Sequence, residues 1–478
     1  MYALLILVPL ASSIILNLLP KGVNKRIAFG LSLALSFLQA LFIFFPACPV
    51  WKTGARTLES VFRFNFFIDN LTSVMLLCIS IVVFVTLLAS RKFIESGEKR
   101  GSFINVILVA LIGMNGAVLT RDIFSLYVFL EITAVSSFIL IALDKDILAF
   151  EGAFKYIVFS AVASVLMLAA ISLLLLLTGS TDFNVIHALF KMQPAHNALV
   201  ILAVGLFLCG LFIKAGLMPF HGWLPDAYSS APAHISVLLA GVVTKVAGIY
   251  ALIRIIVSVL GFTAAVQSVL LLTAALSVIL GAIASLTQSD FRRMLAYSSI
   301  SQVGYIVLGL GSGTALGIAG AIFHIFNHAT FKSLLFVNCA SVEKQTGIRD
   351  MRSLSGLAQR MPVTGVTSVI GSLSCAGIPP LAGFWSKLMI IIALWMEGYR
   401  VYAFIAILGS LLTLAYFLYL QRSIFFGKLN PEFKDIKEAG FALTFPAILL
   451  TAIIILVGLA APLLLEKQIF TLNSIWGG

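Results

Sequence analysis

Charged residues are scarce in this sequence. Asp, Glu, Lys and Arg make up 10% of its 478 residues, whereas a soluble domain carries roughly 25%. Hydrophobic residues make up 61%, so the chain lacks the polar side chains that a water-exposed surface needs. This composition excludes a soluble globular protein and a disordered chain, and it predicts that most of the surface faces lipid.

Cysteine is also scarce, and its positions do not form a ligand set. The five cysteines are Cys48, Cys78, Cys209, Cys339 and Cys375. None falls into a CxxC, zinc or iron–sulfur spacing, which excludes a disulfide scaffold and predicts no cofactor or metal in this chain. The sequence also lacks paired carboxylates, a nucleophile elbow and a phosphate-binding loop with its lysine. We therefore predict no catalytic centre.

Long apolar runs are what the sequence does contain. A membrane helix needs about 20 apolar residues, and a backbone in lipid must satisfy its own hydrogen bonds. The runs are continuous and not alternating, which excludes a β-barrel. We predict an all-α polytopic membrane protein with fourteen helices, the first of them a membrane span and not a removable signal peptide. The predicted spans are 2–19, 27–46, 67–90, 102–119, 123–143, 153–177, 198–218, 233–256, 264–286, 294–311, 315–341, 363–395, 402–425 and 442–465.

The basic residues predict an orientation. The net charge is +12, but Lys and Arg lie singly or in small groups between the apolar runs, which is not a nucleic-acid-binding pattern. Loops after odd-numbered spans hold 19 of them, Arg292 included, and loops after even-numbered spans hold 7, Arg254 included. The positive-inside rule then places the odd loops in the cytoplasm and both termini on the outer, periplasmic side of the cell's inner membrane.

Prolines interrupt two of the spans. A proline removes a helix hydrogen bond, and irregular backbone at membrane depth is tolerated only where protein or a water-filled cavity covers it. The breaks are five spans apart, which predicts two inverted five-helix repeats over spans 4–8 and 9–13, an arrangement typical of transporters. The predicted parts are 1–101 (three helices), 102–256 (first repeat), 264–425 (second repeat) and 426–478 (last helix). The prolines at the breaks are Pro219, Pro225, Pro232, Pro379 and Pro380.

Several ionisable residues lie inside the apolar runs. Each charge at a helix centre costs about 2.5–3.5 kcal/mol, so these groups must pair, contact water or lose their charge. His324, His328 and Lys332 follow one another at intervals of four and share one helix face. A row of such groups joined by water is a candidate proton relay. The candidate residues are Glu131, Lys214, Lys245, His324, His328, Lys332 and Lys387.

Other interpretations of these residues stay open at this point. A lysine near a helix end can extend to the interface, and Glu131 with a lysine can form a purely structural ion pair. The HIFNH spacing of His324 and His328 is that of a zinc pair, but no third ligand is evident. A single deep carboxylate favours protons over Na⁺, although backbone carbonyls at the helix breaks keep Na⁺ open.

Five segments together resemble the antiporter-like subunit family, which includes the proton-pumping membrane subunits of respiratory complex I, the D-type subunits of Mrp cation/proton antiporters and the membrane arms of energy-converting hydrogenases. The similarity extends from about span 3 to span 13. The segments are LYVFLEITAVSSF, KAGLMPFHGWLPDAYSSAPAHISVLLAGVVTKVAGIYALIR, DFRRMLAYSSISQVGYIVLGLG, HIFNHATFKSLLF and AGIPPLAGFWSK.

The resemblance implies a role for each candidate residue. Glu131 and Lys214 match an ion pair that opens and closes with the state of a neighbouring subunit, and Lys245 matches the central proton carrier. His324, His328 and Lys332 match the bridge to a second half-channel, and Lys387 matches the terminal residue that releases protons. We predict transfer from Glu131 and Lys214 through Lys245, then the bridge, then Lys387.

The implied function is a proton-translocating subunit of a multisubunit complex, of the NADH dehydrogenase, membrane-bound hydrogenase or Mrp antiporter kind. Implied partners are other membrane subunits, homologous ones among them, and a peripheral redox arm whose chains hold any Fe–S, flavin, NiFe or quinone cofactor. Two alternatives remain. A stand-alone solute carrier would bind its substrate at Asp226 or the Pro379–Pro380 break, and a structural anchor of a redox enzyme would tolerate neutralisation of every buried charge.

Overall fold

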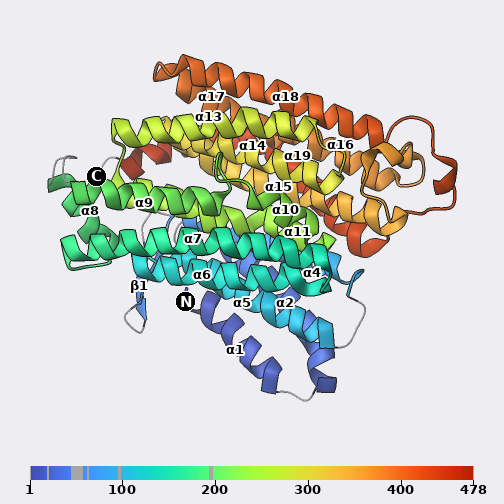
Figure 1. The fold of residues 1–478 in the computed structure, drawn as a ribbon, viewed down its shortest axis with the longest axis horizontal. Helices are drawn as coiled ribbons and strands as arrows, with labels where there is room; N and C mark the ends of the chain where they lie inside the picture. The colour runs from blue at the N-terminus through green and yellow to red at the C-terminus, as the bar shows by residue number, and fades with distance from the viewer. Residues whose placement is uncertain are drawn as a thin grey trace. The chain divides into compact units, whose positions relative to one another are not determined.

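Helices make up most of the structure, as lipid requires of a backbone that must satisfy its own hydrogen bonds. The computed structural model describes residues 2–18, 21–44, 57–61, 64–94, 98–192 and 198–476. The elements (Figure 1) are α1 (Leu4–Leu18), α2 (Lys21–Phe44), β1 (Thr57–Val61), β2 (Phe64–Ile68), α4 (Asn70–Ser90), α5 (Glu98–Leu119), α6 (Ile123–Ile141), η1 (Ala142–Asp144), α7 (Ile147–Thr178), α8 (Phe183–Met192), α9 (Ala198–Ala215), α10 (Trp223–Ser230), α11 (Ala233–Leu238), η2 (Leu239–Val243), η3 (Lys245–Tyr250), α12 (Ala251–Ile255), η4 (Ile256–Leu260), α13 (Ala264–Leu286), α14 (Phe291–Gly311), α15 (Ala315–Thr346), η5 (Met351–Ser353), η6 (Leu357–Gln359), α16 (Pro362–Ala376), α17 (Ala382–Met396), α18 (Arg400–Ile424), η7 (Pro431–Phe433) and α19 (Phe441–Trp476).

The length and composition of these helices make the chain a multi-pass membrane protein. Within the described residues, ten helical segments are long and apolar enough to cross a membrane, and four further apolar helices are shorter. The total of fourteen spans stays a prediction, and so do the orientation and the four predicted parts.

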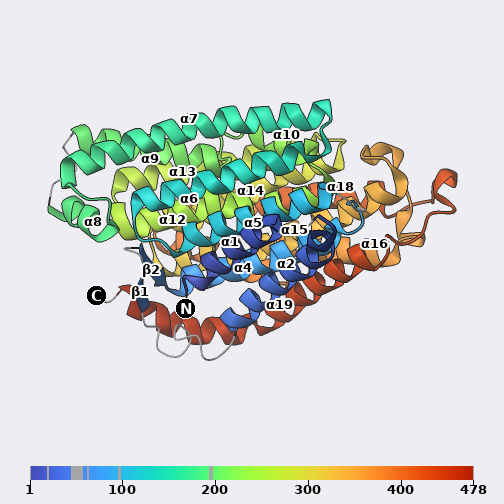
Figure 2. The ribbon, with the colours of Figure 1, turned by 90° about the horizontal axis from the view of Figure 1, so that it is seen from below.

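The chain forms two units. The first comprises Met1–Leu87, Ile94–Gly216 and Val242–Thr263. In it, α5 packs against α1, α2 and α6, and α7 packs against α6 and α9. The neighbouring α6 and α7 lie side by side in Figures 1 and 2. The π-helical η3 packs against α9 and α5, so the segment that begins at Lys245 is in the core of this unit.

The second unit comprises Leu88–Phe93, Leu217–Gly241 and Ala264–Gly478. Its most extensive contact is between α13 and α14, and α15 packs against α14, α16, α17 and α19. The C-terminal α19, red in Figure 2, also packs against α16 and α17. This arrangement surrounds α15 with helices, and its side chains from Ala329 to Val342 are all buried.

The prolines lie where the helices stop and restart. Pro219 lies in the segment between α9 and α10, Pro232 caps the start of α11, and Pro379 and Pro380 lie between α16 and α17. Pro225 is different, because it lies in the first turn of α10, where a missing N–H costs no helix hydrogen bond. Pro225 therefore lies within the interrupted region between α9 and α11, in the short helix α10.

Two parts of the chain repeat the same local structure 168 residues apart. Asp122 bridges to Asp182 in the first unit, and Asp290 bridges to Asp350 in the second. Asp122 caps α6 and Asp290 caps α14. The next long helices, α7 and α15, have 32 residues each. The direction of one repeat relative to the other stays a prediction.

Two elements were not expected from the sequence. Strands β1 and β2 form an antiparallel hairpin just before α4, so the predicted span 67–90 begins as a strand. Helix α4 starts only after Asp69, whose carboxylate accepts a hydrogen bond from the Thr72 amide at 2.8 Å and caps the helix. The short α8 lies in the connection between the predicted spans 153–177 and 198–218.

Candidate functional site

Glu131 and Lys214 form an ion pair in the first unit. Helix α6 carries Glu131, and α9 carries Lys214 in its last turn. The Lys214 ammonium lies 2.9 Å from Oε1 of Glu131. It also donates to the hydroxyls of Ser160 at 3.2 Å and Ser164 at 3.5 Å, both on α7. These three acceptors match the three donors of an ammonium group.

The two members of this pair differ in exposure. The Lys214 side chain is 3% exposed, whereas the Glu131 side chain is 30% exposed. Exposed apolar side chains of α6, such as Val128 and Val135, surround it along the helix. The carboxylate thus lies at the edge of the chain, where the protein alone does not desolvate it completely, and the lysine lies inside.

Lys245 lies in the core of the first unit. It is fully buried and is the first residue of the π-helical η3. Its Nζ atom donates to the Thr244 hydroxyl at 3.1 Å. Short π-helical turns are rare and occur frequently at functional sites. Because η3 packs against α9, the segment carrying Lys245 contacts the helix that ends just after Lys214.

In the second unit, His324 meets the second broken helix. Its Nδ1 atom lies 2.8 Å from the Ser386 hydroxyl of α17. The Asn327 side chain donates to the same hydroxyl at 3.0 Å and to the carbonyl of Ala382 at 2.9 Å. His328 is fully buried one turn further along α15, with its ring centroid 5.4 Å from that of Phe331. Two histidines of α15 are therefore held inside apolar helices.

The two lysines of this unit have different hydrogen-bond acceptors. Lys332 donates to the Leu295 carbonyl at 3.2 Å and to the Ser298 hydroxyl, both on α14. Lys387 donates to the carbonyl of Ala376 at 3.4 Å, the last residue of α16. That carbonyl belongs to the negative end of a helix, which favours a cation. The Lys387 ammonium also lies 4.2 Å from the centre of the Tyr305 ring.

Several buried polar atoms of the second unit have no hydrogen-bond partner within the described part of the chain. They include Nε2 of His324, Oδ1 of Asn327 and Oε1 of Gln302. Buried polar atoms in native proteins are normally paired with protein or with ordered water. Buried polar atoms of this kind are what a hydrated proton path needs.

The first unit contains a buried ion pair that the sequence did not predict. Arg254 was counted in a loop, but it lies in α12 and is 4% exposed. Its two terminal guanidinium nitrogens donate to the Asp69 carboxylate at 2.6 and 2.9 Å, and the guanidinium also donates to the hydroxyls of Thr72 and Tyr250. The partners are 185 residues apart. No local pattern links them, and only the isolated charge at the end of an apolar run was visible in the sequence.

Replacing Arg254 with alanine is expected to destabilise the chain by about 3 kcal/mol. Asp69 would keep a largely enclosed carboxylate whose remaining basic neighbour, Arg121, is 3.9 Å away. Thermal unfolding of the purified protein in detergent measures this loss. Arg293→Ala is the control, since its 2.5 Å ion pair with Asp226 has an arginine that is 38% exposed and should contribute about 1 kcal/mol or less. Equal losses in the two variants would contradict the prediction.

Arg292 was also counted in a loop and is also buried, with 2% of its surface exposed. It donates to the backbone carbonyls of Ser229, at 3.2 Å, and of Ala231. Its other end pairs with Glu343 of α15. Arg292 therefore ties the start of α14 and the end of α15 to the backbone of the first helix break, and its role is structural.

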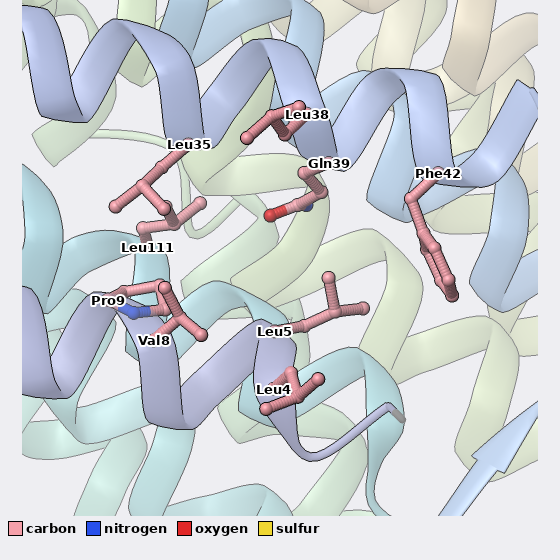
Figure 3. A pocket seen from close by; sticks show the side chains of 9 residues that line it. All are labelled: Leu4, Leu5, Val8, Pro9, Leu35, Leu38, Gln39, Phe42 and Leu111. Atoms are coloured by element: carbon pink, nitrogen blue, oxygen red, sulfur yellow. The ribbon is translucent and has the colours of Figure 1, made fainter.

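A surface cavity of about 200 Å³ lies between α1, α2 and α5 in the first unit (Figure 3). Eight of its nine lining residues are apolar, and the ninth, Gln39, exchanges two hydrogen bonds with Asn115. This cavity offers no charged group to a solute. Nor do the described residues contain a group of three or more His, Cys, Asp and Glu side chains placed to hold a metal ion.

Comparison with known proteins gives a consistent result. The pattern of the transmembrane family described as NADH:quinone oxidoreductase/Mrp antiporter matches residues 120–413. The D-type subunit of the Na⁺/H⁺ antiporter of Alkalihalophilus pseudofirmus is 31% identical over 94% of this chain and 92% of its own length. The N-type subunit of the NADH-quinone oxidoreductase of Desulforudis audaxviator is 36% identical over 78% of this chain and 76% of its own. A chain of the membrane-bound sulfane sulfur reductase, an archaeal respiratory membrane complex, superposes with a TM-score of 0.88 at 30% identity, over 99% of this chain and 96% of that one.

The fold and the matched residues define a class of helical membrane proteins with ionisable groups buried between their helices. This chain belongs to the NADH:quinone oxidoreductase/Mrp antiporter transmembrane family. It is an antiporter-like membrane subunit, as the resemblance of its five segments predicted.

Proposed function

We propose that the chain translocates protons as one subunit of a multisubunit membrane complex, of the Mrp antiporter or respiratory kind. The observation that carries this proposal is the Glu131–Lys214 pair. A partly exposed carboxylate in contact with a buried ammonium joins the edge of the first unit to its interior. At about 2.5–3.5 kcal/mol for each buried charge, four lysines and a glutamate inside apolar helices are costly, and a structural anchor has no use for them.

The proposed proton order is Glu131 and Lys214, Lys245, then the bridge of His328, His324 and Lys332, and finally Lys387. Contacts within each unit support its two ends. In the first unit, η3 with Lys245 packs on the helix that carries Lys214. In the second unit, the His324 ring lies within hydrogen-bond distance of the Ser386 hydroxyl, and Ser386 directly precedes Lys387 on α17. Opening or closing of the first pair would change the charge that Lys245 experiences.

The partners and the orientation belong to the same proposal. We place both termini on the outer side of the cell's inner membrane and any redox cofactor in other subunits of the complex. The curated relatives are named as subunits of a Na⁺/H⁺ antiporter and of NADH-quinone oxidoreductase. These names support the proposal that this chain has partner subunits. They are also compatible with transport of protons, either alone or in exchange for Na⁺.

Isolation of the intact complex in mild detergent, through a tag on this chain, tests the proposal. Mass spectrometry should identify further membrane subunits, and the complex in sealed vesicles should move protons, followed with a pH-sensitive dye. Iron–sulfur or nickel–iron subunits among the partners would indicate a redox-driven pump, and membrane subunits alone would indicate an Mrp-type antiporter. A chain that is isolated alone and transports a solute would overturn the proposal.

A further inference from the structure

Helices α7 and α15 occupy the same register in the two repeats. Each begins one residue after a side-chain cap, Asp146 for α7 and Thr314 for α15, and each cap accepts from the amide three residues later. Each helix ends at a glycine in the left-handed conformation, Gly179 with φ 68° and Gly347 with φ 71°. Every one of these features recurs at an offset of 168 residues, so the two helices can be compared position by position.

The comparison places hydroxyl groups where the second repeat has ionisable groups. At the same offset, Tyr156 corresponds to His324, Ser160 to His328 and Ser164 to Lys332. Tyr156, Ser160 and Ser164 are all buried, as are their three counterparts. The face of α15 that carries the histidines and the lysine therefore corresponds to a face of α7 that carries buried hydroxyl groups.

These hydroxyls contact the ion pair directly. The Ser164 hydroxyl lies 2.5 Å from Oε1 of Glu131 and 2.8 Å from the Ser160 carbonyl. Lys214 donates to both serine hydroxyls as well as to the carboxylate. The corresponding contact of Lys332 is with Ser298 of α14, which lies next to the counterpart of Glu131. In both repeats, then, this helix face meets the same turn of the preceding helix.

We propose that Ser160 and Ser164 are positioning residues of the proton path, which hold the Lys214 ammonium against Glu131 and set the pH at which this pair exchanges its proton. This inference rests on the proposed function. A hydroxyl that hydrogen-bonds an ion stabilises its charged form, and Ser164 can accept from the ammonium while it donates to the carboxylate. If these serines served only to bond backbone carbonyls of α7, they would not need to occupy the positions that correspond to His328 and Lys332 in the other repeat.

Infrared titration of the Glu131 carboxyl tests the inference without depending on transport. The band is assigned in the purified complex by its loss in Glu131→Gln. Ser164→Ala should shift the midpoint by about one pH unit, because hydrogen bonds to charged groups contribute roughly that much. Ser164→Thr, which keeps the hydroxyl, should restore it. Ser172→Ala is the control, since this exposed serine of α7 bonds only the Leu168 carbonyl among the described contacts.

Proton transport by the same variants completes the experiment. The Ser160→Ala, Ser164→Ala double variant should transport about tenfold more slowly than the parent complex, and Ser172→Ala should transport at the parental rate. An unchanged Glu131 midpoint in Ser164→Ala would overturn the inference, whatever the transport rates are. A parent complex that moves no protons would overturn the proposed function instead, and the titration would still decide the role of the serines.

Discussion

Replacing Lys245 with alanine is expected to abolish proton translocation and to leave the complex assembled. The side chain is fully buried in η3, and its Nζ atom bonds the neighbouring Thr244 hydroxyl. Alanine removes the only group at this position that can carry a proton. It also removes a charge whose burial is costly, so the melting temperature should be unchanged or higher. Dye-detected proton uptake into vesicles, together with a thermal melt, measures both effects.

Lys155→Ala is the matched control for this prediction. Lys155 is a lysine of the same unit, but its side chain is 39% exposed and pairs with Glu151 one turn away on the surface of α7. Its loss should change neither transport nor assembly, because exposed pairs contribute little. Parental proton uptake by Lys245→Ala would contradict the proposed order of transfer, and loss of assembly would show that the buried lysine is structural.

The helices and the ionisable residues were predictable because both depend on local composition. An apolar run has one way to cross lipid, and a lysine such as Lys214 or Lys387 in such a run is conspicuous. The proline-rich segments likewise predicted where helices α9 and α16 stop. Each of these predictions needs only neighbouring residues, and the comparisons confirm the helical membrane fold and the family.

The contacts that organise the first unit were not predictable in the same way. The Asp69–Arg254 pair joins residues 185 apart, and its arginine looked like one more basic residue in a loop. Ser160 and Ser164 carried no signal either, because serine is common among the buried polar residues of this chain. Only the common register of α7 and α15 distinguishes these two serines. The partial exposure of Glu131 depends in the same way on how α6 packs.

The π-helical turns of η2, η3 and η4 were also invisible in the sequence. A π-helical turn has no characteristic amino-acid composition. It differs from an α-helical turn in that its hydrogen bonds join residues five apart and not four apart. What the sequence of η3 does contain is Gly248, three residues after Lys245. Its importance follows from packing, which brings η3 against α9 within the first unit.

Replacing Gly248 with alanine is expected to impair both stability and transport. A Cβ atom added to Gly248 would lie 2.3 Å from the Cα atom and 2.5 Å from the amide nitrogen of Ala215. Backbone atoms cannot turn aside as a flexible side chain can, so η3 and α9 must separate. Overpacking of this kind costs about 1–3 kcal/mol. Ala215 follows Lys214, so the separation also moves the ammonium away from the geometry that it shares with Glu131.

Gly205→Ala separates this steric effect from a general effect of alanine in a membrane helix. Gly205 lies in α9, the helix that Gly248 approaches, but a Cβ atom there would meet nothing within 4 Å, and the gain in helix propensity should stabilise the chain by up to about 1 kcal/mol. We expect a lower melting temperature and at least tenfold slower proton uptake for Gly248→Ala. For Gly205→Ala we expect parental proton uptake and a melting temperature at or slightly above the parental value. Lys245→Ala would differ from both, with transport lost and stability kept, because it removes the proton carrier without moving the helix. Parental behaviour of Gly248→Ala would mean that the close approach of η3 to α9 does not hold the ion pair in place, and transport would then not depend on that contact.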